Sequence, residues 1–285
     1  MQTDLENGFL VEISDAEMRS IQDAILKRYD VDFHNYEPKS FKRRLLRIYR
    51  KFNFTSSFDL WSRTLKDKDF IHEFINEVSV GLTALFRDPE FWQTLQELIK
   101  KEIIYQKEIH IWHAGCSSGE EIYTAGIIWE ELKITHKVKS LATDISSNAL
   151  NAAKSGAIVK AKAPEYQRNF LQFNPKGNFD QYFTEDAKNL YVKKEYFSYV
   201  NFVNSNLIMD ELAYMDTDKY DIVFCRNVLI YFNSQAKTIV IDKIFKALKP
   251  GGFLIVGFLD SLVSYLDEDR FEYYNMNQRI FRKKI

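Results

Sequence analysis

A change in the hydrophobic pattern near residue 109 most constrains what this 285-residue chain can fold into. From there on, short apolar runs typical of buried strands alternate with stretches typical of helices. The predicted strands are 109–113, 139–144, 220–227 and 252–258, and the predicted helices are 120–133, 146–154 and 234–248. This alternation indicates a doubly wound, Rossmann-like α/β fold, in which helices cover both faces of a mostly parallel sheet.

The first hundred residues show helical periodicity only. Ser14 and Glu17 have the spacing of a capping box before a helix that runs to residue 29. Pro38 stands where the first turn of the next helix would begin. Further helices are predicted over 56–65, 68–80 and 88–103. We predict an all-helical N-terminal domain over residues 1–85 and an α/β domain over 86–285.

The alternation breaks between residues 157 and 207. The stretch "YQRNFLQF" predicts a helix, whereas "NLYVKKEYFSYVNFV" is rich in the aromatic residues and valine typical of strands. We predict a small antiparallel β-subdomain, inserted at about 160–205 beside the main sheet. The last segment, "FEYYNMNQRIFRKK", predicts a closing pair of strands.

Composition narrows the functional classes. The formal net charge is −1, so no overall electrostatic attraction draws the chain to nucleic acid or to a membrane surface. Two cysteines are no disulfide framework and fit a reducing compartment. No signal peptide or membrane-spanning apolar run is present, so we expect a cytoplasmic protein without membrane insertion. The five histidines form no cluster of metal-ligand spacing, and no metal is expected.

The turn "WHAGCSSGEE" follows the first predicted strand. Two glycines between a strand and a helix are typical of a phosphate-binding turn, but Glu120 and Glu121 would repel a phosphate. They would suit a cofactor that carries a cation, such as S-adenosylmethionine. Alternatively, both acids only stabilise the first turn of the helix. Asp144 ends the second predicted strand, where an acid commonly binds ribose hydroxyls, and this favours the cofactor.

These motifs resemble the CheR-type chemotaxis receptor methyltransferases, which are protein-glutamate O-methyltransferases. The similarity rests on "IWHAGCSSGEEIYTAG", "LATDISSNALNAAKSG", "YDIVFCRNVLIYF" and "LKPGGFLIVGFLDSL", in the order and spacing of that family. The stretch "VSVGLTALFRDPEFW" resembles a further family motif in the N-terminal half. The similarity covers roughly residues 10 to 283.

The resemblance implies S-adenosylmethionine as the cofactor, with S-adenosylhomocysteine as the product. It also implies a role for each matching residue. Glu121 would bind the ammonium and Asp144 the ribose, while Asn206 and Leu207 would lie by the adenine. Thr83 and Arg87 would contact the methionine end, with Arg226 and Asn227 at the end of the next strand. Arg87 and Tyr231 would face the substrate as the catalytic residues.

The sequence departs from the family pattern in three places. Gly81 replaces an asparagine that contacts the cofactor, and Leu85 replaces a phenylalanine. The stretch "GFLD" at 257–260 stands where the family has "GHSE". The first change bears on cofactor affinity and the last on the substrate.

The helix predicted over 38–52 is basic. It carries seven Lys or Arg and no acid, while Phe41, Leu45, Ile48 and Phe52 form one apolar stripe. Such charges can simply be solvated, or they can attract nucleic acid, but the resemblance favours docking of the helical cytoplasmic region of a chemoreceptor-like protein. We therefore expect a monomeric enzyme that esterifies receptor glutamates. The alternatives are the same fold acting on another substrate, and a weakened S-adenosylmethionine sensor or docking module.

Overall fold

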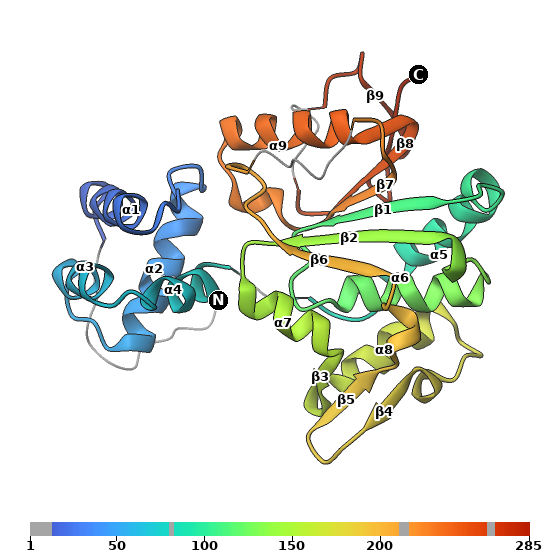
Figure 1. Ribbon diagram of the computed structural model, residues 1–285, viewed down its shortest axis with the longest axis horizontal. Helices are drawn as coiled ribbons and strands as arrows, with labels where there is room; N and C mark the ends of the chain where they lie inside the picture. The colour runs from blue at the N-terminus through green and yellow to red at the C-terminus, as the bar shows by residue number, and fades with distance from the viewer. Residues whose placement is uncertain (1–12, 80–82, 211–216, 261–265) are drawn as a thin grey trace. The chain divides into compact units, whose positions relative to one another are not determined.

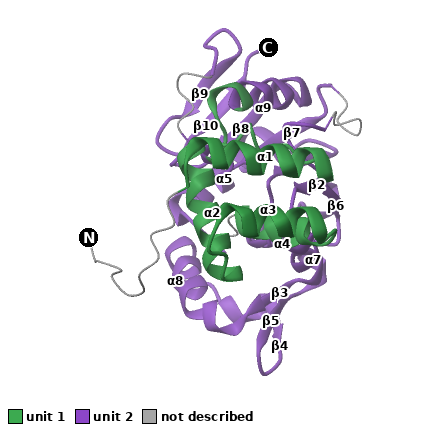
Figure 2. Cartoon of the chain, turned by 90° about the vertical axis from the view of Figure 1, so that its left-hand side faces the viewer, with its two compact units in different colours: residues 1–80, 231–236 green, residues 81–230, 237–285 purple. Residues whose placement is uncertain are grey.

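The computed structural model describes residues 13–79, 83–210, 217–260 and 266–285. The chain forms two compact units (Figure 2). The smaller unit comprises residues 1–80 and 231–236, and the larger comprises 81–230 and 237–285. The domain limits predicted from the sequence, 1–85 and 86–285, stay a prediction.

The larger unit is built on a seven-stranded sheet in the order β6-β2-β1-β7-β8-β10-β9 (Figure 1). The first five strands run parallel, and the last two close the sheet in antiparallel register. The strands are β1 (Ile109–Ala114), β2 (Val138–Asp144), β6 (Val200–Asn204), β7 (Tyr220–Cys225), β8 (Leu248–Val256), β9 (Phe271–Asn275) and β10 (Ile280–Lys283). The predicted α/β class and the closing pair of strands are confirmed. Because β1 pairs with both β2 and β7, the strand order reverses at β1, which is where such folds bind ligands.

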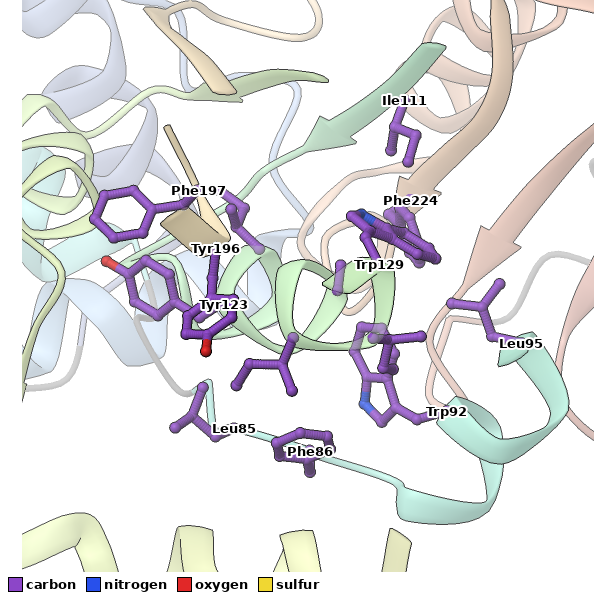
Figure 3. Close-up of a cluster of buried hydrophobic side chains, with 14 of the residues drawn as sticks. Leu85, Phe86, Trp92, Leu95, Ile111, Tyr123, Trp129, Tyr196, Phe197 and Phe224 are labelled. Carbon is purple, nitrogen blue, oxygen red and sulfur yellow. The ribbon is translucent and has the colours of Figure 1, made fainter. Parts of the chain in front are cut away.

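Helices cover both faces of this sheet, α9 on one side and α5 and α6 on the other (Figure 1). The helices are α5 (Pro89–Leu98), α6 (Glu120–Glu131), α7 (Ser147–Ser155), α8 (Ala163–Phe173) and α9 (Ser234–Ala247). The single helix expected over 88–103 is α5 followed by a π-helical turn at Ile99–Ile103. Figure 3 shows the buried cluster between sheet and helices, which includes Ile111, Phe224, Trp92, Leu95, Tyr123 and Trp129.

The inserted segment forms a separate three-stranded antiparallel sheet, as predicted. Its strands are β3 (Ala157–Val159), β5 (Asn189–Val192) and β4 (Phe183–Glu185). Residues 200–204 were expected in this subdomain, but they form β6, which pairs in parallel with β2 at the edge of the main sheet. The segment between β5 and β6 contains the short 3₁₀ turn Lys194–Tyr196 and no glycine or proline. The sequence therefore carries no local signal that the chain passes from the small sheet to the main sheet here.

In the described part of the smaller unit, residues 13–79, four α-helices lie close to their predicted limits. They are α1 (Asp15–Tyr29), α2 (Pro38–Phe52), α3 (Ser57–Lys66) and α4 (Phe70–Val78). The capping box is present: the Glu17 amide donates to Ser14 Oγ at 3.2 Å, and the Ser14 amide donates to Glu17 Oε2 at 2.9 Å. The Phe74 ring lies 5.4 Å from Phe33 and 6.1 Å from Phe70, which gives this unit an aromatic core of its own.

Gly126 lies in α6, where the helix packs closely against the backbone of the inserted segment. A Cβ atom there would lie 1.8 Å from the carbonyl oxygen of Tyr196, which is backbone and cannot rotate away. Helix propensity alone predicts that Gly126→Ala stabilises the protein by about 1 kcal/mol. We predict instead a loss of about 1–3 kcal/mol or more in the free energy of unfolding, because this packing must open. Urea unfolding measures this change in free energy, provided that the m-value is unchanged. A raised unfolding midpoint would contradict the close packing of Gly126 against the Tyr196 carbonyl.

Candidate active site

Two glycines shape the turn after β1. Gly115 and Gly119 have left-handed backbone, with φ of +80° and +94°. A Cβ atom at Gly115 would lie 2.5 Å from Val228 Cγ2, and one at Gly119 would lie 2.8 Å from Tyr123 Cζ. The Gly115 amide donates to the carbonyl oxygen of Thr143 at 2.8 Å and so ties the turn to β2. Glycine is required at both positions, because any side chain there would be strained and would meet Val228 or Tyr123.

Asp144 ends β2 beside this turn. Its Oδ2 accepts a hydrogen bond from the Ser117 amide at 2.8 Å, and its Oδ1 accepts one from the Ser146 amide at 2.9 Å. Burial raises the pKa of Asp144, and hydrogen bonds from the amides of Ser146, Ser117 and Ile145 lower it in part. A carboxylate has about four lone-pair sites, more than these three amides use. Asp144 can therefore accept hydrogen bonds from hydroxyl groups while the backbone fixes its orientation.

Glu121 lies in a chain of charged groups at the start of α6. Its Oε1 is 2.9 Å from His113 Nδ1, and its Oε2 is 3.6 Å from a guanidinium nitrogen of Arg226. Arg226 also donates to Asp88 Oδ2 at 2.6 Å. Burial lowers the pKa of Arg226, and the nearby Glu121 and Asp88 raise it. Two carboxylates thus flank one buried cation.

Glu120 has a different environment. It is only 3% exposed, and its carboxylate accepts hydrogen bonds from Ser118 Oγ at 2.7 Å and from the Tyr166 hydroxyl at 3.2 Å. The ammonium of Lys162 is 3.8 Å away. Because Tyr166 lies on α8, Glu120 connects α6 to the inserted segment. This structural role distinguishes it from Glu121.

The loop that carries Thr83 and Arg87 is held by the same two helices. The Asn169 side-chain amide on α8 donates to the Leu85 carbonyl oxygen at 3.0 Å, and the Phe86 amide donates to Thr124 Oγ1 on α6 at 3.0 Å. The Arg87 side chain is 34% exposed, with its Nε 4.0 Å from Asp88 Oδ2. Gly81, the first departure from the family pattern, lies outside the described residues.

The stretch "NSNL" follows β6. The Asn206 side-chain oxygen accepts from the Ile208 amide at 3.0 Å, and Leu207 is buried. The Lys243 ammonium donates to the Leu207 carbonyl oxygen at 3.2 Å and to that of Ile208 at 2.7 Å. The turn therefore has a fixed shape, which the buried Leu207 side chain and the Lys243 ammonium support.

Asp260 supports the loop after β7. It is 2% exposed and accepts hydrogen bonds from the amides of Asn227 at 2.7 Å, Gly257 at 2.8 Å and Ile230 at 3.0 Å. Asn227 itself has φ of +59°. Burial raises the pKa of Asp260, and the three amides lower it. The "GFLD" departure thus keeps a carboxylate with a structural role.

Tyr231 belongs to the smaller unit. Its carbonyl oxygen accepts a hydrogen bond from the Glu37 amide at 2.8 Å, and the Arg44 guanidinium carbon lies 5.8 Å from the centre of its ring. Arg87 belongs to the larger unit. The expectation that Tyr231 and Arg87 face one substrate therefore stays a prediction.

Four residues that organise the site were not predicted from the sequence. Asp88 and Asp260 had no assigned role, Tyr166 was only part of a predicted helix, and His113 was only one of five histidines without metal-ligand spacing. Asp88 has the clearest signal, because it directly follows Arg87 in a matching motif. Tyr166 and Asp260 act through contacts with residues distant in the sequence, and His113 acts through Glu121, eight residues further on.

No group of three or more His, Cys, Asp or Glu in the described ranges is placed to hold a metal ion. Among the same residues, no helix is long and apolar enough to cross a membrane.

The chain is similar to known methyltransferases along nearly its whole length. The family model described as "CheR methyltransferase, SAM binding domain" matches residues 81–280, and "CheR methyltransferase, all-alpha domain" matches 16–79. "Putative methyltransferase Cher3" of Pseudomonas putida is 31% identical over 270 residues, which cover 95% of this chain and 97% of that protein. "Chemotaxis protein methyltransferase" of Vibrio parahaemolyticus is 29% identical over 286 aligned residues, covering 96% and 98% of the two chains.

The fold and these matches define an S-adenosylmethionine-dependent methyltransferase. More particularly, the chain belongs to the CheR methyltransferase family. The residues present fit its cofactor, because a close-packed glycine turn lies between two oriented carboxylates, Asp144 and Glu121. The sequence-based predictions of family, fold class and cofactor are confirmed.

We predict that Asp144→Ala weakens S-adenosylmethionine binding by about 1–3 kcal/mol, the scale of a hydrogen bond to a charged group. Isothermal titration calorimetry measures the change. Asp221 is a matched control, because it is also buried but lies near the start of β7 and pairs with Lys249 at 2.8 Å. Asp221→Asn should leave the Kd within about twofold, since a change distant from the ligand is near neutral for binding. An unchanged Kd for Asp144→Ala would refute its ribose role.

Proposed function

We propose that this protein transfers the methyl group of S-adenosylmethionine to glutamate side chains of a chemoreceptor-like signalling protein, forming methyl esters. The observation that carries the proposal is the match to both CheR domains, which together span residues 16–280 with one residue between them. Relatives named "Chemotaxis protein methyltransferase" support the chemotaxis role. The receptor region would be cytoplasmic, so we place the protein in the cytoplasm, as a monomer.

The proposed cofactor contacts follow the strand ends. Glu121 would bind the ammonium, since its carboxylate is already oriented by His113. Asp144 would accept from the ribose hydroxyls. Asn206 and Leu207 would contact the adenine from the turn after β6, whose shape Lys243 fixes.

Four more residues would complete the cofactor site. Thr83 and Arg87 would contact the methionine end from a loop that α6 and α8 hold in place. Arg226 is only 4% exposed at its side chain, so it would act mainly by fixing Glu121. Asn227 would present its side chain from the loop that Asp260 supports.

The chemistry needs few groups from the protein. When bound, the cofactor supplies an electrophilic methyl group on a sulfonium, and a thioether leaves as the C–O bond forms. A substrate glutamate is already ionised at neutral pH, because its usual pKa is about 4.3, so no general base is required. Arg87 would orient the incoming carboxylate or the carboxylate of the cofactor by a charge-assisted hydrogen bond. Tyr231 would face the substrate. The protein would act chiefly by alignment and partial desolvation.

The partner surface is proposed to lie on α2. Its predicted apolar stripe is buried at Phe41, Leu45 and Ile48. On the exposed side, Arg47 and Lys51 both pair with the buried Glu77, at 2.9 and 2.6 Å. Lys42 pairs with Asp15 at 2.7 Å. Among the described residues of this unit, no ion pair is found for Lys39, Arg43 or Arg50, so these three would receive an acidic receptor helix.

The ester chemistry is tested directly. The protein is incubated with methyl-labelled S-adenosylmethionine and a chemoreceptor cytoplasmic fragment, and the product is then treated with base. We expect release of labelled methanol, because carboxyl methyl esters hydrolyse whereas N-methyl and ether linkages do not. Base-stable label would instead support another substrate of the same fold. Cofactor binding without any transfer would support the sensor alternative.

The docking surface makes a separate prediction. Arg43→Glu with Arg50→Glu should raise the KM for the receptor fragment by about 3- to 30-fold, with little change in the Kd for the cofactor, since rim charges act on association. The effect should shrink as salt rises. Lys68→Glu is the control, because Lys68 is an exposed base of the same unit outside α2. An equal effect of Lys68→Glu would contradict a specific role of α2.

A further inference from the structure

His113 carries a role beyond the proposed contacts. It lies on β1, is 2% exposed, and its Nδ1 is 2.9 Å from Glu121 Oε1. An ionised carboxylate has only acceptor atoms, so Nδ1 must carry the hydrogen and donate. A buried histidine is thus bound to the carboxylate proposed to meet the cofactor ammonium.

The ring of His113 is held in one orientation. In the parallel ladder between β1 and β7, His113 is the register partner of Phe224. The two rings stack with centroids 4.7 Å apart and an interplanar angle of 3°. Phe224 in turn lies 6.1 Å from Trp92 within the buried cluster shown in Figure 3. Because the imidazole cannot swing without opening this packing, its N–H direction is set by the sheet.

Glu121 is consequently held at both oxygens. His113 binds Oε1, and Arg226 lies 3.6 Å from Oε2. Arg226 is itself fixed, because it donates to Asp88 and lies 4.2 Å over the centre of the Phe91 ring. A glutamate side chain has three rotatable bonds, so a free carboxylate would lose entropy on meeting a ligand. A carboxylate held in advance avoids that cost.

We propose that His113 is a positioning residue, which holds the Glu121 carboxylate in the orientation that receives the ammonium of S-adenosylmethionine. The proposal rests on the role of Glu121 given under the proposed function. It predicts that the two parts of the cofactor depend differently on His113. Binding of the amino-acid part of the cofactor depends on His113, whereas binding of its nucleoside part does not.

Two variants test the donor. His113→Phe keeps a stacking ring but removes the N–H, and His113→Asn keeps an N–H near the place of Nδ1. Kd values are measured by calorimetry for S-adenosylhomocysteine, which has the ammonium, and for 5′-methylthioadenosine, which lacks the amino-acid part. We expect His113→Phe to raise the Kd for S-adenosylhomocysteine about 5- to 50-fold, as for one lost hydrogen bond to a charged group. The Kd for methylthioadenosine should change by less than about twofold. His113→Asn should retain S-adenosylhomocysteine affinity within about threefold.

A purely structural role gives a different result. If His113→Phe weakens both ligands equally, or neither, the proposal is wrong. Should His113→Phe fail to fold, His113→Gln replaces it, because a glutamine carries its N–H farther out and cannot match Nδ1. Under the proposal, His113→Gln then loses affinity for S-adenosylhomocysteine alone.

Glu121→Gln separates this inference from the proposed function. If Glu121→Gln leaves S-adenosylhomocysteine binding unchanged, the assigned ammonium site fails, and the inference fails with it. If Glu121→Gln weakens that ligand selectively but His113→Phe does not, only the inference fails. The double variant should be no weaker than Glu121→Gln alone, since both changes remove the same interaction.

Discussion

The buried guanidinium of Arg226 is the group on which the geometry of the site depends. A cation this far from water loses several kcal/mol of solvation free energy, which is offset only by well-placed partners. Asp88 at 2.6 Å and Glu121 at 3.6 Å supply the charge, and the Phe91 ring lies under the cation. Because these partners come from the loop before α5, from α5 and from α6, the end of β7 cannot shift without them.

The two carboxylates share this cation unequally. Asp88 is the closer partner by 1.0 Å, the difference between 3.6 and 2.6 Å, and it makes the hydrogen bond. Glu121 lies farther from the same guanidinium, so this ion pair neutralises its charge less completely than that of Asp88. This division explains how an acid can be fixed in place by a salt bridge and still serve as the proposed ammonium site. Removing Asp88 would change that division even though Asp88 need not contact a ligand.

The elements of the fold were predictable, and much of the support for the site was not. Period-two and helical patterns are local, so β1, β2, β7 and their helices follow from the sequence within a few residues. The placement of β6 depends on pairing with β2, which no local signal in 189–203 reveals. The role of Asp260 likewise depends on amides that the pairing of β7 with β8 brings near it, whereas the contact of His113 with Glu121 depends on the shape of the turn between β1 and α6. The glycine turn and the acids at the strand ends could be predicted, because turn-forming residues are visible in a short stretch of sequence.

A similar distinction applies to the basic helix. Seven positive charges are visible in the sequence of α2, yet Glu77, 25 residues beyond its end, takes up two of them. The exposed bases without an ion pair in the described part of the smaller unit, Lys39, Arg43 and Arg50, are separated by four and seven residues. At 100° per residue these three fall on one face, and at 1.5 Å per residue they extend over about 16 Å. Such a line of charge suits an elongated acidic partner better than a single anionic group. Because Glu77 pairs with Arg47 and Lys51, the exposed bases of α2 without such a pair form a narrow stripe, which is the surface proposed above to bind an acidic receptor helix.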